Sequence, residues 1–100
     1  MQEQHYMGLN QDRYGGMTHI GRIVRDARVF GLIAEDEECA NWTSARMQSL
    51  YEEVCAEWER HGYLPSRLPD DLRERHARIH DAAIRRARAL GWNAELGEDD

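Results

Sequence analysis

The sequence has no lysine, only two cysteines and only two prolines among its 100 residues. It also has no apolar run of about 18 residues, the length that a membrane-spanning helix needs, so we expect no membrane contact. The first 16 residues show neither the basic leader nor the apolar core of a secretory signal. Together these absences favour a cytoplasmic location, where Cys39 and Cys55 are expected to be reduced thiols. The exclusive use of arginine is typical of a GC-rich bacterial genome.

Sequence motifs of catalysis are missing as well. We find no glycine-rich phosphate loop, no nucleophile elbow and no His-Glu-x-x-His pattern. A Cys55–His76 dyad is geometrically conceivable, but a cysteine among buried residues is expected to be inert. The sequence therefore predicts that the protein is not an enzyme. Its net charge of −6 also argues against general binding to nucleic acid.

What the sequence does contain is helical periodicity. Apolar residues recur at helical spacing in three segments, which we expect to form helices over about 18–30, 43–61 and 69–90. Side chains suited to capping stand at the start of the first two segments, and a glycine follows each of the three. The capping candidates are Thr18, Asn41 and Thr43, and the glycines are Gly31, Gly62 and Gly91.

We therefore predict an all-α fold, a small three-helix domain over residues 18–92. The second and third helices are expected to form an antiparallel helical hairpin about the proline-containing linker 62–68, with the first helix packed across it. Residues 1–17 show no periodicity and are expected to form a flexible N-terminal arm or to dock late. Residues 93–100 carry four acids and are expected to form an acidic tail.

Charge is distributed unevenly along the chain. Residues 35–62 carry a net charge of −6, whereas residues 63–91 carry +3. Such a contrast favours pairing within the fold. The third helix also places its acids early and its arginines late, with acid-to-arginine pairs four residues apart, an arrangement that stabilises a helix. These pairs are Asp71–Arg75, Glu74–Arg78 and Asp81–Arg85. We interpret its arginines as a paired, solvated face and expect no nucleic-acid site.

Three arginines of the third helix have no acid four residues before them, namely Arg73, Arg86 and Arg88. With Trp92 and Ile84, which fall outside the main apolar stripe, they are our predicted partner-binding residues. The leading hypothesis is a non-enzymatic protein–protein interaction or accessory, regulatory module of a bacterial cytoplasmic system. It would act on a protein partner or as a homodimer, without a cofactor.

The alternative hypothesis is a metal-binding or metal-sensing helical domain. His76 and His80 are four residues apart and project from one helix face, as two ligands of a transition metal would. In an antiparallel hairpin, Cys55 would lie level with His76 and supply a third ligand. Zinc or another transition metal would then be the cofactor. A half-buried histidine pair without metal is the simpler interpretation.

Overall fold

The computed structural model describes residues 5–92, and in that part of the chain it is helical without a strand. Three α-helices, α1 (His19–Val29), α2 (Ser44–Arg60) and α3 (Asp70–Ala89), form the framework. Each bound lies within one residue of the predicted one, so the all-α prediction is confirmed. Three short 3-10 turns precede α1 or join α2 to α3: η1 (Leu9–Gln11), η2 (Arg13–Gly15) and η3 (Pro65–Arg67).

The helices begin and end where the capping residues predict. The Thr18 hydroxyl accepts a hydrogen bond from the Gly21 amide, and Thr43 does the same for Arg46. After α1, Gly31 adopts a left-handed backbone with a φ of 72°, and the amide of Leu32 bonds back to the Ala27 carbonyl at 2.9 Å. This is the Schellman pattern, which satisfies carbonyl groups at a helix end. The ends of α2 and α3 repeat it with Gly62 and Gly91.

The hydrophobic core lies mainly between α1 and α2. Its buried side chains come from α1, α2 and two connecting segments: Leu9, Ile23, Val24, Ala27, Cys39, Met47, Leu50 and Val54. In contrast, Ala87 is the buried residue of α3, and Leu90, just after its last residue, is exposed. The third helix is therefore attached to the rest of the domain with little buried apolar surface.

Polar contacts attach α3 instead. The Arg75 guanidinium donates to the Val29 carbonyl at 3.1 Å, and Arg78 forms an ion pair with Glu35 at 2.9 Å. The predicted pairing of the acidic segment 35–62 with the basic segment 63–91 is thus observed between Glu35 and Arg78. The partners of Arg75 and Arg78 lie outside α3, whereas the sequence predicted acids within the helix.

The region predicted as a flexible arm is packed against the domain from His5 onward. Tyr6 exchanges backbone hydrogen bonds with the loop before α2, at 2.9 Å to Trp42 and 2.7 Å from Asn41. Leu9 inserts into the core and is 5% exposed. Residues 1–4 of the predicted arm, and the acidic tail 93–100, lie outside the described residues. Residues 5–17 are thus docked on the domain, which is one of the two arrangements expected for this segment.

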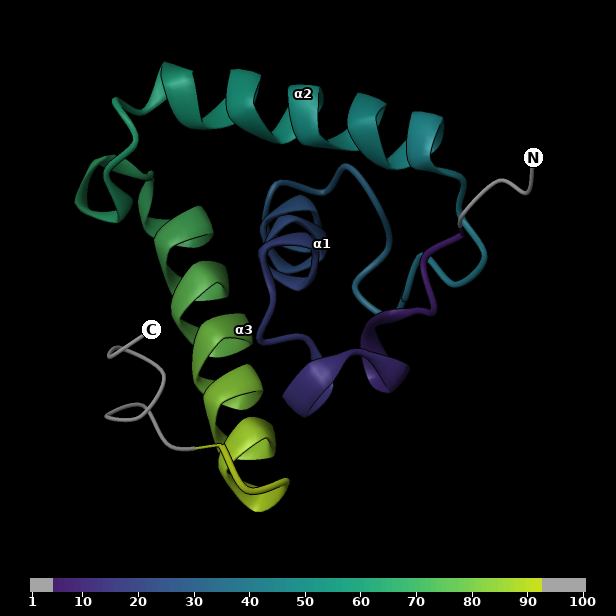
Figure 1. The fold of residues 1–100 in the computed structure, drawn as a ribbon. Helices are drawn as coiled ribbons and strands as arrows, with labels where there is room; N and C mark the ends of the chain where they lie inside the picture. The colour runs from purple at the N-terminus through teal and green to yellow at the C-terminus, as the bar shows by residue number, and fades with distance from the viewer. Residues whose placement is uncertain (1–4, 93–100) are drawn as a thin grey trace.

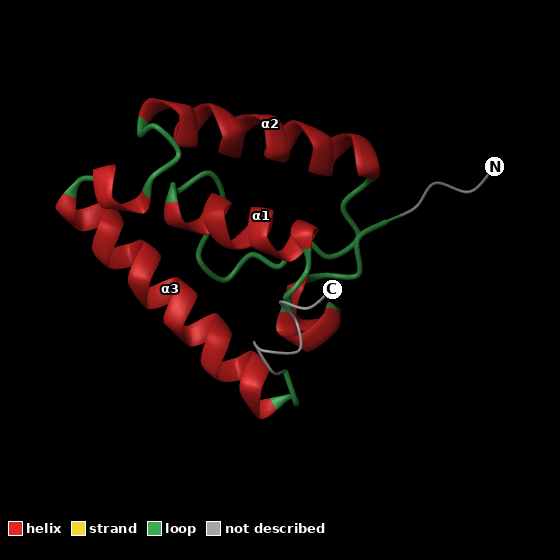
Figure 2. Ribbon diagram, turned by 60° about the vertical axis from the view of Figure 1, so that its left-hand side comes forward, coloured by secondary structure: helices red, strands yellow, loops and turns green. Residues whose placement is uncertain are grey.

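The relative placement of the helices differs from a simple hairpin. Figure 1 shows α1 between α2 and α3, which diverge from the linker that joins them, and Figure 2 shows the same arrangement from another side. The two helices meet near the linker, where the rings of Trp58 and His76 lie 5.8 Å apart. Antiparallel packing of α2 on α3 along their length is therefore not confirmed, because α1 occupies the space between them. The divergence leaves a cleft.

Candidate functional site

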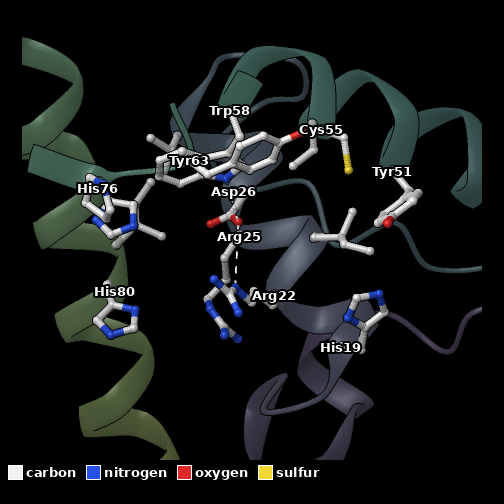
Figure 3. A pocket seen from close by; sticks show the side chains of 15 residues that line it. His19, Arg22, Arg25, Asp26, Tyr51, Cys55, Trp58, Tyr63, His76 and His80 are labelled. Atoms are coloured by element: carbon white, nitrogen blue, oxygen red, sulfur yellow. Dashed lines mark hydrogen bonds and ion pairs between the residues drawn. The ribbon is translucent and has the colours of Figure 1, made fainter. Parts of the chain in front are cut away.

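The cleft between α2 and α3 is the candidate functional site. It has a volume of about 640 Å³, with α1 as its floor and the two longer helices as its walls. Figure 3 shows the side chains that line it. The α2 wall presents Tyr51, Val54, Cys55 and Trp58, and the α3 wall presents His76, Ile79 and His80. A volume of this size is typical of sites that bind a small molecule or part of a larger partner.

Aromatic packing fixes the end of the cleft nearest the linker. The Trp58 ring meets Phe30 edge to face, with 5.2 Å between centroids, and meets His76 in the same manner. Its indole N–H donates to the Asp26 carboxylate at 3.0 Å. Two ring contacts and the N–H hydrogen bond thus fix the position of the Trp58 side chain. Tyr63, just beyond α2, covers the same corner and is 59% exposed.

The predicted metal ligands lie on two different walls. His76 and His80 are neighbours on α3, with nearly parallel rings 5.7 Å apart. Cys55 lies on the α2 wall, across the cleft from them, where it contacts the Tyr51 hydroxyl and raises the pKa of that phenol. Within residues 5–92, no group of three histidine, cysteine, aspartate or glutamate side chains is placed to hold a metal ion. The metal-binding alternative keeps the two imidazoles of α3 as its ligands.

Burial governs the protonation of His76. Removal from water lowers the pKa of this imidazole below its ordinary value, and the neighbouring His80 and Arg22 lower it further, while Asp26 acts in the opposite direction. His76 is therefore a neutral ring at neutral pH. Its ring meets Trp58 edge to face, is nearly parallel to the ring of His80 and lines the cleft.

The floor of the cleft carries a buried cation. Arg25, in the middle of α1, is 8% exposed. Its guanidinium donates to the carbonyl oxygen of Gly16, which precedes α1. Burial lowers the pKa of Arg25, Arg22 lowers it further, and Asp26 opposes both effects. The sequence did not reveal this residue because helical periodicity counts arginine as polar, and the segment that covers it has no periodicity.

The predicted partner-binding residues do not line the cleft. Arg73 is exposed and pairs with Asp70 at 2.8 Å. Arg86 reaches the side chain of Asn10 and packs over Gly15, which joins α3 to the N-terminal segment. The remaining three lie in the C-terminal part of the helix and just after it, where Arg88 is exposed and both Ile84 and Trp92 are half-buried.

A second hollow, of about 500 Å³, lies at the start of α1, between the N-terminal segment and α2. It shares His19, Ile23 and Tyr51 with the cleft, so the two hollows adjoin along one edge of α1. Exposed apolar side chains border it, including Met7 and Ile20. Other exposed apolar side chains lie in the linker after α2 and at the end of α3, namely Tyr63, Leu64 and Leu90.

Comparison with known proteins supplies no further assignment. No protein-family model, curated protein or solved structure matches the chain. None of the helices in the described part of the chain has the length and apolar character needed to cross a membrane. The functional interpretation therefore depends on the residues of the cleft.

Proposed function

We propose that the protein is a non-enzymatic interaction or accessory module of the bacterial cytoplasm, and that its cleft receives a helical segment of a partner protein. The observation that carries this proposal is the divergence of α2 and α3, which leaves an aromatic-lined cleft of about 640 Å³ open along α1. The cleft between α2 and α3 leaves space for part of a further helix to pack beside α1.

The spacing of the wall residues suits a helical occupant. On α2, Tyr51, Val54 and Trp58 follow one another at intervals of three and four residues, so they form one stripe facing the cleft. On α3, His76 and Ile79 are likewise three apart. A helix that packs between two such stripes interdigitates its own side chains with them, as in other helix-in-groove complexes.

The composition of the cleft also favours recognition of a protein. Tryptophan, tyrosine and arginine are the residues that contribute most to binding energy in protein interfaces. Trp58, Tyr63 and Arg22 supply all three types around one hollow. Trp58 is held in place by its bond to Asp26, so little conformational freedom would be lost when a partner binds.

Photo-cross-linking tests the proposal. We suggest replacing Tyr63, at the cleft, by p-benzoylphenylalanine and expressing the protein in its native host. A matched control carries the same group at Glu53, an exposed α2 residue that lines neither hollow. We expect a discrete cross-linked protein from position 63, lost when Ile79→Asp places a charge in the cleft.

Two other results are informative. Equal cross-linking from positions 63 and 53, or none from either, would contradict the proposal. A cross-link from position 63 to a second copy of this chain would identify the protein as its own partner, which is the homodimeric form of the same hypothesis.

A further inference from the structure

The cleft floor places two cations side by side. Arg22 and Arg25 are three residues apart on α1, and both line the cleft (Figure 3). The charge of Arg22 lowers the pKa of Arg25, and Asp26 acts more strongly in the opposite direction. Repulsion between two guanidinium groups costs free energy unless an anion or water lies between them. The pair is therefore a feature that a ligand anion would stabilise.

The hydrogen-bond partner of the buried Arg25 guanidinium is a neutral group. Arg25 is more than nine-tenths buried, and that partner is the Gly16 carbonyl. A guanidinium has five N–H donors, and a buried charge is costly unless it is paired. No ion pair of Arg25 with an acid occurs within residues 5–92. Asp26 and Asp12 act on its charge through space, without an ion pair to either.

The acid nearest to the two arginines is already engaged. Asp26 accepts the Trp58 indole N–H at 3.0 Å, and its contact with Arg22 is long, at 4.0 Å. Among the described residues that line the cleft, Asp26 is the one acid, whereas His19, His76 and His80 add further nitrogen atoms. With two arginines against one acid, the described lining of the cleft has a net positive charge within a protein of net charge −6, and such local contrast favours an anionic ligand.

Apolar groups surround this basic floor. Ile23, Val29 and Val54 line the cleft near the arginines, and Ile79 closes it from α3. An inorganic ion alone would leave these surfaces in water. A carboxylate carried on an apolar body would satisfy both parts of the site.

We infer that the cleft recognises a carboxylate, and that the partner helix supplies it as an aspartate or glutamate flanked by apolar residues. Arg22 and Arg25 would bind the carboxylate through charge-assisted hydrogen bonds, while the apolar neighbours pack on Trp58 and Ile79. This inference rests on the proposed function for its occupant, and it adds the chemistry by which that occupant is selected.

Phenylacetate is a suitable probe because it combines a carboxylate with an apolar ring. Phenylacetamide is its neutral counterpart, and phenethylamine is the cationic one. Binding is followed by ¹H–¹⁵N NMR at the Trp58 indole N–H, assigned with Trp58→Phe. For a probe of about ten non-hydrogen atoms we expect a dissociation constant on the order of 1 mM. Phenylacetamide should bind about tenfold more weakly, and phenethylamine should cause no saturable shift.

Two substitutions of matched exposure complete the test. The Arg22 side chain is 75% exposed and the Arg60 side chain, at the end of α2, is 74% exposed, so neither change should unfold the protein. We expect Arg22→Gln to weaken phenylacetate binding about tenfold and Arg60→Gln to leave it unchanged. Thermal unfolding followed by circular dichroism confirms that both variants are folded.

The outcomes separate this inference from the proposed function. If phenylacetate and phenylacetamide bind equally, or if Arg22→Gln has no larger effect than Arg60→Gln, carboxylate recognition is overturned even when cross-linking finds a partner. If the carboxylate binds and depends on Arg22 but cross-linking finds no partner, carboxylate recognition stands and the proposed function fails. A cross-linked partner segment that binds equally well after every acid is changed to its amide would also overturn the inference.

Discussion

The indole N–H of Trp58 lies 3.0 Å from a carboxylate oxygen of Asp26, and this hydrogen bond joins α2 to α1 at the linker end of the cleft. Trp58→Phe keeps an aromatic ring but removes the donor. Because a hydrogen bond to a partly buried carboxylate is lost, we expect the free energy of unfolding to fall by about 1.5–3 kcal/mol. Asp26→Asn keeps an acceptor oxygen and should cost less. Urea unfolding measures both variants, and an unchanged midpoint for Trp58→Phe would contradict the assigned role.

Gly21→Ala should destabilise the protein although alanine is the better helix former. A Cβ at this position of α1 would lie 2.1 Å from the carbonyl oxygen of Gly16, the group that accepts the Arg25 hydrogen bond. The backbone must shift, at a cost of about 1–3 kcal/mol, which exceeds the helix-propensity gain of about 1 kcal/mol.

The control for Gly21→Ala is Ser49→Ala, on the exposed surface of α2. It gains helix propensity without a clash and should leave stability equal or slightly higher. Thermal unfolding of the two variants provides the comparison. A Gly21→Ala protein as stable as the parent would show that the contact with Gly16 is not tight.

Replacing the two threonine caps, Thr18 and Thr43, should lower the free energy of unfolding by different amounts. Thr43 accepts one bond, from the Arg46 amide at 3.2 Å, and Thr43→Ala should cost about 1 kcal/mol. Thr18 accepts from the Gly21 amide and also donates to the Asp12 carboxylate at 2.6 Å. Thr18→Ala should therefore cost about 2 kcal/mol. If chemical denaturation shows the same loss of unfolding free energy for Thr18→Ala and Thr43→Ala, Asp12 has no role in fixing the N-terminal segment.

Stability should fall as the pH is lowered from about 7.5 to 5.5, in part because of His76. Burial lowers the pKa of this imidazole in the folded state below its ordinary value of 6.5. As the pH falls through that value, the unfolded chain takes up the proton before the folded chain does, so the unfolded state is favoured. His76→Gln should flatten this dependence. His5→Gln, at an exposed residue, is the control, and an equal slope in both variants would refute the account.

The local structure of the helices could be predicted from the sequence, and their mutual arrangement could not. The helix bounds follow from apolar periodicity and from short-range capping at residues such as Thr18 and Gly31, which depend on neighbours a few positions away. The angle between α2 and α3 depends instead on which surfaces α1 covers. A hairpin was expected because the linker is short, but α1 separates the two helices and opens the cleft.

The part of the site that depends on helical spacing could also be predicted. Neighbouring His76 and His80 follow from helical spacing alone. Cys55 was expected near His76, whereas Trp58 is the α2 residue that meets that ring. Arg25 is buried because residues 5–17 dock against α1. The sequence of that segment has no apolar periodicity, so its position could not be predicted. The partner-binding surface predicted around Arg86 and Arg88 stays a prediction. These residues do not line the cleft.

Cys55 offers a native probe of the cleft, and Cys39 offers an internal reference. The Cys39 thiol is fully buried, and burial raises its pKa to about 11, so it should not react with alkylating reagents at pH 7.5 while the protein is folded. The sequence predicts an inert Cys55 among buried residues, but the structure places this thiol half-buried on the α2 wall of the cleft, so it should react in the purified protein. Mass spectrometry distinguishes the two modified peptides.

The rate at which N-ethylmaleimide alkylates Cys55 in the native host, compared with the purified protein, tests most directly whether a partner occupies the cleft. The matched control is Ala56→Cys with Cys55→Ser, which moves the thiol to the exposed neighbouring position on α2. We predict that Cys55 is alkylated at least about tenfold more slowly in cells, while a thiol at position 56 reacts at the same rate in both settings. Equal rates for Cys55 in cells and in the purified protein would contradict a cleft filled by a partner.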